Sequence, residues 1–553
     1  MGASSISPPI EGRSLGELSR TQVNLAVAGM VLTLLTAAMI QGLAITAVPR
    51  AIANLNGFPR YPWVTTSFLL TSTIAMPVFA KLSDLYGRKW LYVWSAVIFV
   101  LSLFLCGAAG SLPLPLDGMN QLIVATGLLG VANGAIIALT FTLVADLFPP
   151  SERGRYQGIM AAVFGVAFTV GPPLGGWITD HFSWRWAYRA DIPLGILAIV
   201  VVYLALPDLR PQQPRPQQVR RLIDWAGIIT LSGWIVPLLL ALTWVGQSSW
   251  SEPRIRNLLI GSAVLLAAFL LVERRAREPL LELSLFRDRR ISLMSVNFFL
   301  MGIGLFGAAV YLPLFVQGVL AESAAKSGLV MAQYTLSLIA GNLIGGQLLS
   351  RTGKYRLLAV AGAGLAAGGL FLMSRMDGST AQLVLLRNAI ICGIGFGVLT
   401  PTYEVLVQNA APREQLGVAT GFTQFARTIG GTIGLALFGT VLLSLYHLHV
   451  DRLIPAATPK ELAKIFDNPL LLVFTHPNLE GAFSQVPNGR VLLANVLEGV
   501  RNGLSSALHS IFLYAAGTMA VTFILSLFLR EDRHRKNPEN QGAAASRLLG
   551  RQR

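Results

Sequence analysis

The chain is a succession of long apolar runs, and their length decides what it can fold into. A helix needs about 20 mainly apolar residues to cross the hydrocarbon core of a bilayer. The sequence predicts an all-α integral membrane protein with fourteen transmembrane helices. Their approximate positions are 23–48, 64–81, 91–111, 120–146, 157–179, 187–206, 224–243, 256–273, 292–319, 326–350, 356–374, 384–409, 417–446 and 505–530.

Charge follows the same pattern. The chain carries a formal net charge of +16, and its Lys and Arg residues gather in the two tails and in alternate connections between apolar runs. Basic residues placed in this way mark the cytoplasmic side and contact lipid headgroups, which argues against nucleic-acid binding. We therefore expect a multi-pass protein of the cell (inner) membrane, with both termini in the cytoplasm.

The cysteines and histidines of the chain give no pattern of metal ligands, disulfides or catalytic groups. Cys106 and Cys392 lie within predicted helices, so neither a disulfide framework nor a metal site is expected from them. His447, His449 and His476 are irregularly spaced and have no cysteine near them. No nucleophile–base pair or phosphate loop indicates an enzyme, and we expect no metal and no cofactor.

An internal repeat divides the chain. The turn at 80–88 recurs at 346–354, with Leu, Gly and a base at matching positions. The turn at 149–158 recurs at 412–421 with nearly the same offset, again with matched Pro and Gly residues. Two six-helix bundles in parallel repeat, with two helices inserted between them, are typical of a secondary transporter whose substrate binds near the midplane.

The predicted domains follow from this division. The last part of the long second-bundle loop, 491–509, spaces apolar residues as an amphipathic helix does. The boundaries are a cytoplasmic segment at 1–22, a first bundle at 23–206, cytoplasmic linkers with two inserted helices at 207–291, a second bundle at 292–530 containing an extracytoplasmic loop at 447–504, and a basic cytoplasmic tail at 531–553.

Several short motifs lie along the chain over about residues 25–530. They are the turn at 80–89, the Gly- and Pro-rich run at 167–176, Trp184-Arg185-Trp186 with Pro193-Leu194-Gly195, Asp224-Trp225 with Gly227, 278–286, and Phe425-Ala426-Arg427 with Gly430-Gly431. Together these motifs resemble the 14-helix drug:proton antiporter family of the major facilitator superfamily. The resemblance implies the major facilitator fold and multidrug efflux driven by a proton gradient.

Two of these motifs are predicted to form a gate. Asp84 would lie near the start of the thirteenth span, where a helix N-terminus favours a carboxylate, and Arg88 would reach Asp84 or Asp146. The run in the fifth span removes side-chain bulk, permits a kink and lets a neighbouring helix approach; the resemblance implies that it shapes the seam between the halves. The alternatives are retention of positive charge inside and plain packing. The predicted gate residues are Asp84, Gly87, Arg88, Lys89, Asp146, Gly171, Pro172, Gly175 and Gly176.

The first half departs from the family pattern. Family members carry an acidic residue nine positions before a proline in the first span, and here Ile40 precedes Pro49 at that distance, with Gln41 beside it. The fourth span carries Thr126 where the family has an arginine. Both groups that usually couple transport to protons in the first half are therefore absent.

Charged residues elsewhere within the spans are candidates to replace them, because such charges are costly in a membrane. Glu404 is the first candidate for a proton or cation-substrate site, and the alternative is a structural pair with Arg427. Arg189 and Asp191 replace residues that are generally uncharged in relatives. Their spacing keeps them from facing one another on a helix, so each selects substrate, pairs elsewhere or anchors at headgroups.

The leading hypothesis is export of amphipathic organic compounds by alternating access, driven by protons. A dedicated exporter of a siderophore, lipid or other endogenous metabolite is the second hypothesis, and a non-transporting sensor or scaffold is the third. The expected partners are a small amphipathic molecule and the bilayer, not nucleic acid. We expect a functional monomer. A periplasmic adaptor and an outer-membrane channel are further candidate partners.

Overall fold

The computed structural model describes residues 20–148, 150–206, 225–245, 251–276, 288–410, 416–450, 470 and 489–529, and the regular structure within them is helical. Thirteen helices are long and apolar enough to cross a membrane. The shorter apolar helix Ala226–Leu242 adds another at the predicted seventh position. The predicted all-α membrane fold is therefore confirmed, and each of the fourteen apolar runs is helical.

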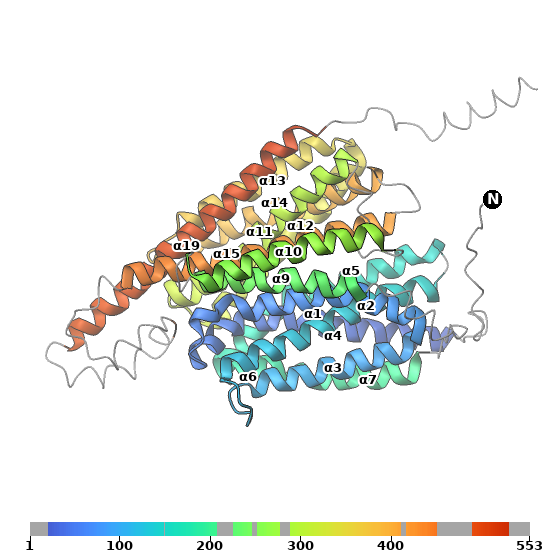
Figure 1. The fold of residues 1–553 in the computed structure, drawn as a ribbon, viewed down its shortest axis with the longest axis horizontal. Helices are drawn as coiled ribbons and strands as arrows, with labels where there is room; N and C mark the ends of the chain where they lie inside the picture. The colour runs from blue at the N-terminus through green and yellow to red at the C-terminus, as the bar shows by residue number, and fades with distance from the viewer. Residues whose placement is uncertain are drawn as a thin grey trace, which may run out of the picture.

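The helices follow one another along the chain (Figure 1). The first six spans are α1 (Arg20–Asn54), α2 (Tyr61–Tyr86), α3 (Arg88–Ala108), α4 (Gly118–Leu147), α5 (Pro150–His181), and α6 (Trp184–Arg189) with α7 (Ile192–Ala205). The inserted spans are α9 (Trp225–Val245) and α10 (Pro253–Arg275). The last six are α11 (Arg289–Leu314) with the π-helix η4 (Phe315–Val319), α12 (Ala324–Thr352), α13 (Tyr355–Ser374), α14 (Gln382–Ala410), α15 (Leu416–Val450) and α19 (Gly489–Leu527).

The two groups of six spans pack in the same way. In the first group α1 packs on α5, while α2 and α3 both pack on α4. In the second group α11 packs on α15, while α12 and α13 both pack on α14. The internal repeat in the sequence thus corresponds to a repeat in helix packing.

The bundles are inclined to one another (Figure 1). We call the end that carries Arg20 and Leu527 the terminal end and the opposite end, with the connections at 55–60 and 320–323, the distal end. The ribbons of the bundles lie closest at the distal end and diverge toward the terminal end.

Contacts between the bundles gather at the distal end. The Tyr61 hydroxyl donates to the Val310 carbonyl at 3.1 Å. The Phe58 and Tyr446 rings meet edge to face, with centroids 5.3 Å apart. A ring contact from η2 (Phe58–Arg60) and a hydrogen bond from α2 therefore join the first bundle to the second at this end.

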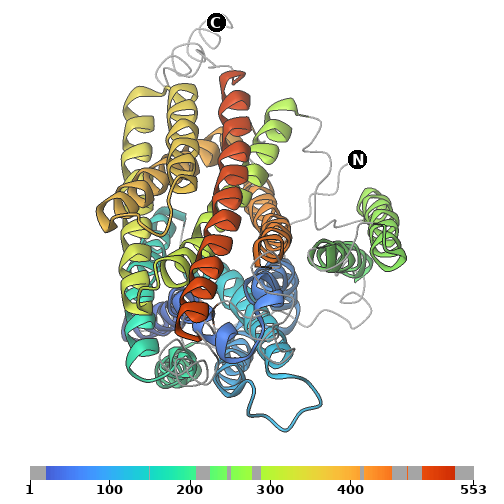
Figure 2. The same ribbon diagram turned by 90° about the vertical axis from the view of Figure 1, so that its left-hand side faces the viewer.

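The inserted helices cover one flank of the molecule (Figure 2). Leu231, Ile235 and Leu239 of α9 form an apolar cluster with Leu70 of α2 and Ile429 of α15. Helix α9 therefore contacts both bundles along the line where α2 and α15 meet, and α10 packs on its far side.

Some helix boundaries differ from the prediction. Residues 447–450 continue α15 and 489–504 begin α19, so these parts of the expected loop at 447–504 are helical. The expected amphipathic helix and the fourteenth span form one continuous helix. Buried Leu497, Val500 and Leu504 continue the apolar face of α19 before residue 505, where the span was predicted to begin. The sixth span is divided, since α6 ends at Arg189 and α7 begins at Ile192.

The two repeated turns both need glycine. Gly87 joins α2 to α3 with φ 88° and ψ 147°, and Gly353 ends α12 with φ 63° and ψ 8°. Residues other than glycine enter the left-handed helical region near Gly353 at a cost of about 1–2 kcal/mol. The Gly87 conformation is one that glycine alone adopts readily, and strain there reaches about 3 kcal/mol.

Replacing these glycines tests the turn geometry. Gly87→Ala is expected to lower the melting temperature of the purified protein more than Gly353→Ala, because alanine at position 87 has no nearby allowed conformation. Tryptophan fluorescence during heating in detergent measures both variants. Equal losses, or a larger loss for Gly353→Ala, would contradict the turn geometry.

Candidate functional site

The predicted gate turn is held within the first bundle. Arg88 Nη1 donates to the Thr142 carbonyl at 3.1 Å, one helical turn before Asp146. Lys89 Nζ lies 5.4 Å from the centroid of the Tyr203 ring. The side chains of Asp84 and Asp146 lie outside the described residues, so their contact with Arg88 and with the start of α15 stays a prediction.

The Gly- and Pro-rich run of α5 lets α1 approach closely. A Cβ atom at Gly171 would lie 3.0 Å from the Cα atom of Gly42. A Cβ atom at Gly175 would lie 2.6 Å from the Cα atom of Leu43. Both distances are shorter than van der Waals contact, so only glycine fits at these two positions without moving α1.

The same run also contacts the second bundle. A Cβ atom at Gly176 would overlap the carbonyl of Ala324, and one at Gly328 would overlap the carbonyl of Pro172. Thr46 Oγ1 donates to the Pro172 carbonyl at 3.2 Å. Helices α1, α5 and α12 therefore meet through small residues at the distal end.

A hydrogen bond from the π-helix extends this junction. Gln317 Nε2 of η4 donates to the Thr46 carbonyl at 3.0 Å, and the Gln317 side chain is fully buried. π-Helical turns are frequent at functional sites. Through Thr46 the contact links η4 in the second bundle to α1 and α5 in the first.

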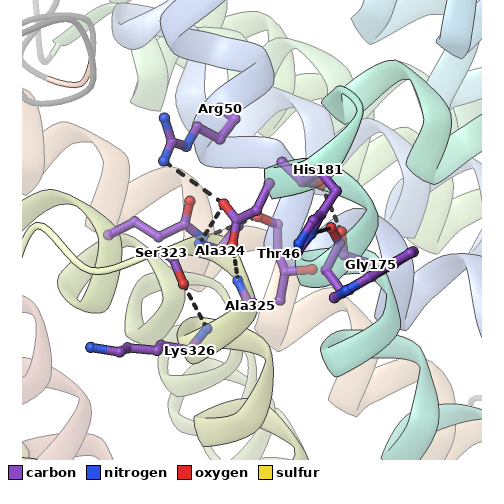
Figure 3. Close-up of polar contacts among 12 residues, drawn as sticks. Thr46, Arg50, Gly175, His181, Ser323, Ala324, Ala325 and Lys326 are labelled. Carbon is purple, nitrogen blue, oxygen red and sulfur yellow. Dashed lines mark hydrogen bonds and ion pairs between the residues drawn. The ribbon is translucent and has the colours of Figure 1, made fainter.

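A carboxylate that sequence reasoning missed lies at the end of this seam. Asp180, one turn after Gly176, accepts hydrogen bonds from the backbone N–H groups of Ala324 at 3.1 Å and Ala325 at 2.7 Å. Arg50 Nη2 lies 3.9 Å from Asp180 Oδ1. Figure 3 shows Arg50 and the start of α12 converging on this point. An acid one turn beyond the run, and a Ser-Ala-Ala helix start at 323–325, are the sequence signals that could have found it.

A polar cluster is embedded in the second bundle. Gln424 Nε2 of α15 donates to Glu404 Oε1 of α14 at 2.8 Å. Arg427, one turn from Gln424, interacts electrostatically with Glu404, and its Nε atom is buried without a hydrogen-bond partner among the described residues. The structure thus brings Glu404 and Arg427 into one cluster, with Gln424 as the direct partner of the carboxylate.

Gln41 is not hydrogen-bonded to this cluster in the described part of the chain. Gln41 Nε2 donates to the Ala37 carbonyl of its own helix at 3.3 Å. Asn133 Nδ2 of α4 donates to the same carbonyl at 2.6 Å. Gln41 therefore belongs to a polar contact within the first bundle.

Arg189 and Asp191 have separate surroundings, as their spacing predicts. Arg189 Nη2 donates to the Gly107 carbonyl of α3 at 2.9 Å. Asp191 lies at the break between α6 and α7, is 1% exposed, and has no hydrogen-bond partner for either carboxylate oxygen within the described residues. Arg189 is thus paired within the first bundle, and burial argues against headgroup anchoring by Asp191.

Comparison with known proteins gives the same fold and a family. The sequence profile of the Major Facilitator Superfamily matches residues 30–435. Multidrug transporter protein MdtP of Bacillus subtilis (strain 168) is 32% identical over 525 residues, covering 93% of this chain and 94% of that protein. Multidrug resistance protein 3 of the same organism is 29% identical, with 93% and 96% covered. Citrate exporter 1 of Yarrowia lipolytica is 27% identical, with 93% and 73% covered.

A solved structure agrees on the fold. A bacterial homolog of the human lysosomal transporter Spinster, crystallised in an inward-facing and occupied conformation, superposes with a TM-score of 0.61 at 12% sequence identity, covering 91% of this chain and 97% of that chain. The chain belongs to the Major Facilitator Superfamily, and the relatives that match nearly its whole length include a protein named as a multidrug transporter and one named as a multidrug resistance protein. The resemblance inferred from the motifs is confirmed, and the chain is a membrane transporter.

Two glycines of α5 form a matched pair of test sites. Gly176→Ala is expected to push α12 from α5 at the distal end and to destabilise the protein by about 1–3 kcal/mol, as overpacking does. Gly158→Ala is the control, because a Cβ atom there meets nothing within 4 Å. Thermal unfolding and transport rate are measured for both variants. Equal behaviour of the two variants would contradict the close packing of the seam.

Proposed function

We propose that the chain is a secondary active transporter that exports amphipathic organic compounds by alternating access. The observation that carries this proposal is the junction of α1, α5, η4 and α12, which joins the two bundles at the distal end through small residues and hydrogen bonds. Packed bundles that meet at one end and diverge toward the other are suited to rocking about a midplane site. The multidrug transporters among the relatives support the substrate class.

The distribution of basic residues supports an orientation. Lys and Arg concentrate at the terminal end, which we assign to the cytoplasm under the positive-inside rule. The distal end then faces outward in a cell (inner) membrane. In the described conformation the contacts between bundles close the outer end, so this conformation corresponds to access from the cytoplasm.

The Glu404 cluster is the proposed coupling site. A carboxylate held away from water gains affinity for a proton, and a neighbouring cation lowers that affinity. A change in the separation of Glu404 and Arg427 between the two access states would therefore change proton affinity. The proton gradient would then drive export without the first-span acid and fourth-span arginine of the family pattern. No bound cofactor is needed in this scheme.

A second substrate class has its own support. Citrate exporter 1 of Yarrowia lipolytica is named for an anionic metabolite, and Arg427 Nε lacks a hydrogen-bond partner within the described residues. A dedicated exporter of an anionic metabolite would use Arg427 as the counter-charge. We propose a monomeric transporter in either case; a periplasmic adaptor and an outer-membrane channel would be additions to it.

Glu404→Gln tests the coupling proposal. A proton crossing 100 mV supplies about 2.3 kcal/mol, which sustains roughly a fiftyfold concentration ratio. The variant is expected to lose this accumulation ratio while retaining exchange of substrate, because binding persists without proton transfer. Efflux of a cationic dye from cells, with and without an uncoupler, and exchange in proteoliposomes give the two readouts.

Glu322→Gln is the control, since Glu322 pairs with Lys326 at the exposed surface at 2.6 Å. Its efflux should equal that of the parent. Efflux by the parent that ignores the uncoupler would remove the proton part of the proposal. An unchanged pH dependence in Glu404→Gln would exclude Glu404 as the coupling residue.

A further inference from the structure

We propose that Asp180 is a positioning residue of the transport cycle, whose carboxylate holds the distal end closed by capping helix α12 from the opposite bundle. We call this contact the distal latch: Asp180 with the N–H groups of Ala324 and Ala325. The inference rests on the proposed alternating-access function and adds a determinant of its conformational equilibrium.

The hydrogen bonds of the first turn of α12 show why the latch matters. The first N–H groups of a helix have no partner within the helix. Here the Lys326 N–H donates to the Ser323 hydroxyl at 3.1 Å, and the Ser327 N–H donates to the Ser323 carbonyl at 3.0 Å. The remaining two donors, on Ala324 and Ala325, are satisfied by Asp180 of the first bundle. The cap of α12 is therefore completed across the seam.

Electrostatics favours the same contact. The N-terminus of a helix carries a positive partial charge, which stabilises a nearby anion. Arg50 of α1 lies 3.9 Å from the carboxylate on the first-bundle side. The side chains of Arg50 and Asp180 are 33% and 17% exposed, so the charges are only partly screened by solvent. Asp180 is thus placed between a cation of its own bundle and the helix terminus of the other.

Close packing fixes the distance at which the latch forms. Gly176 lies one turn before Asp180 on α5, and its missing side chain admits the backbone of Ala324. The same turn of α12 therefore meets a glycine and a carboxylate on one face of α5. Opening the distal end would separate both contacts together.

The related contact elsewhere in the repeat is apolar. Helices α15 and α2 correspond to α5 and α12, and there the Pro62 side chain occupies the space beside Gly439. Thr440 Oγ1, next to that glycine, donates to the Leu242 carbonyl of α9. The charged cap is therefore a property of the α5–α12 side of the seam.

Distance measurement between the bundles tests the latch. Spin labels on Leu114→Cys and Gly378→Cys report the separation of the distal connections, because both positions are exposed and belong to different bundles. Native Cys106 and Cys392 are free but buried, so the spin label reacts with the two introduced cysteines instead. In the parent protein without substrate, double electron–electron resonance should show mainly a short separation of the two labels, which corresponds to a closed distal end.

Asp180→Asn removes the charge with little change in size. We expect the population with the long label separation, relative to the population with the short one, to rise about 5- to 30-fold. This is the effect of losing a partly buried charge–helix contact. Asp117→Asn is the matched control. Asp117 pairs with Arg60 of its own bundle at 2.6 Å, and the hydrogen bond from Arg60 lowers the pKa of Asp117, so the control also removes an ionised carboxylate. It should leave the distance ratio unchanged.

Ala324→Pro provides a second route if Asp180→Asn fails to fold. Proline suits the first position of a helix, and Ser323 before it already has φ −68° and ψ 158°. This variant deletes one latch donor without altering a charge, and the long distance should again gain population. A ratio equal to the parent in the folded variant, or the same rise in Asp117→Asn, would overturn the proposal.

The distance readout needs no substrate, so it separates the latch from the proposed function. A shift in Asp180→Asn in a protein that moves no dye would support the latch and count against drug export. Normal coupled efflux in the parent with no shift in the variant would support export and refute the latch.

Discussion

The close approach of α5 and α12 at the distal end is the contact on which the arrangement of the two bundles depends. Backbones can come this near only where side chains are absent, which Gly176 and Gly328 provide on the two helices. Lipid tails offer little hydrophobic drive for helix association, so packing and interhelical hydrogen bonds hold such a seam. The Thr46 and Gln317 hydrogen bonds lie at the same level and reinforce it.

Polarity in the bundles falls into two separate regions. The distal seam contains Asp180 and Arg50 at a helix terminus, while Glu404 and Arg427 lie toward the terminal end of α14 and α15. The predicted contact of Asp84 with the start of α15 would place a carboxylate–helix cap at the terminal end as well. One cap at each end would let the same physical interaction stabilise either access state in turn.

The fold was predictable because each span must form its backbone hydrogen bonds within itself in the bilayer, where water is absent. Hydropathy and charge are therefore sufficient to place the helices. The apolar spacing at 491–509 also predicted the helix that begins at Gly489, whereas the break between Arg189 and Ile192 in the sixth span was missed. In the site, glycine and intramembrane charge pointed to Gly176, Glu404 and Arg427. Asp180 was missed because its partner N–H lies 144 residues away. The acid after the run and the Ser-Ala-Ala helix start become informative only once α5 and α12 are known to meet.

Alternating access requires the two ends of the seam to open in turn. Spin-label distances in one lipid-embedded protein, with and without a cationic dye and a proton gradient, measure this directly. Labels at Leu114 and Gly378 follow the distal end, and labels at Gly158 and Gly346, where a Cβ atom meets nothing within 4 Å, follow the terminal half. Alternating access predicts that the distal distance lengthens as the terminal distance shortens. Distances that stay fixed, or that lengthen together, would contradict it.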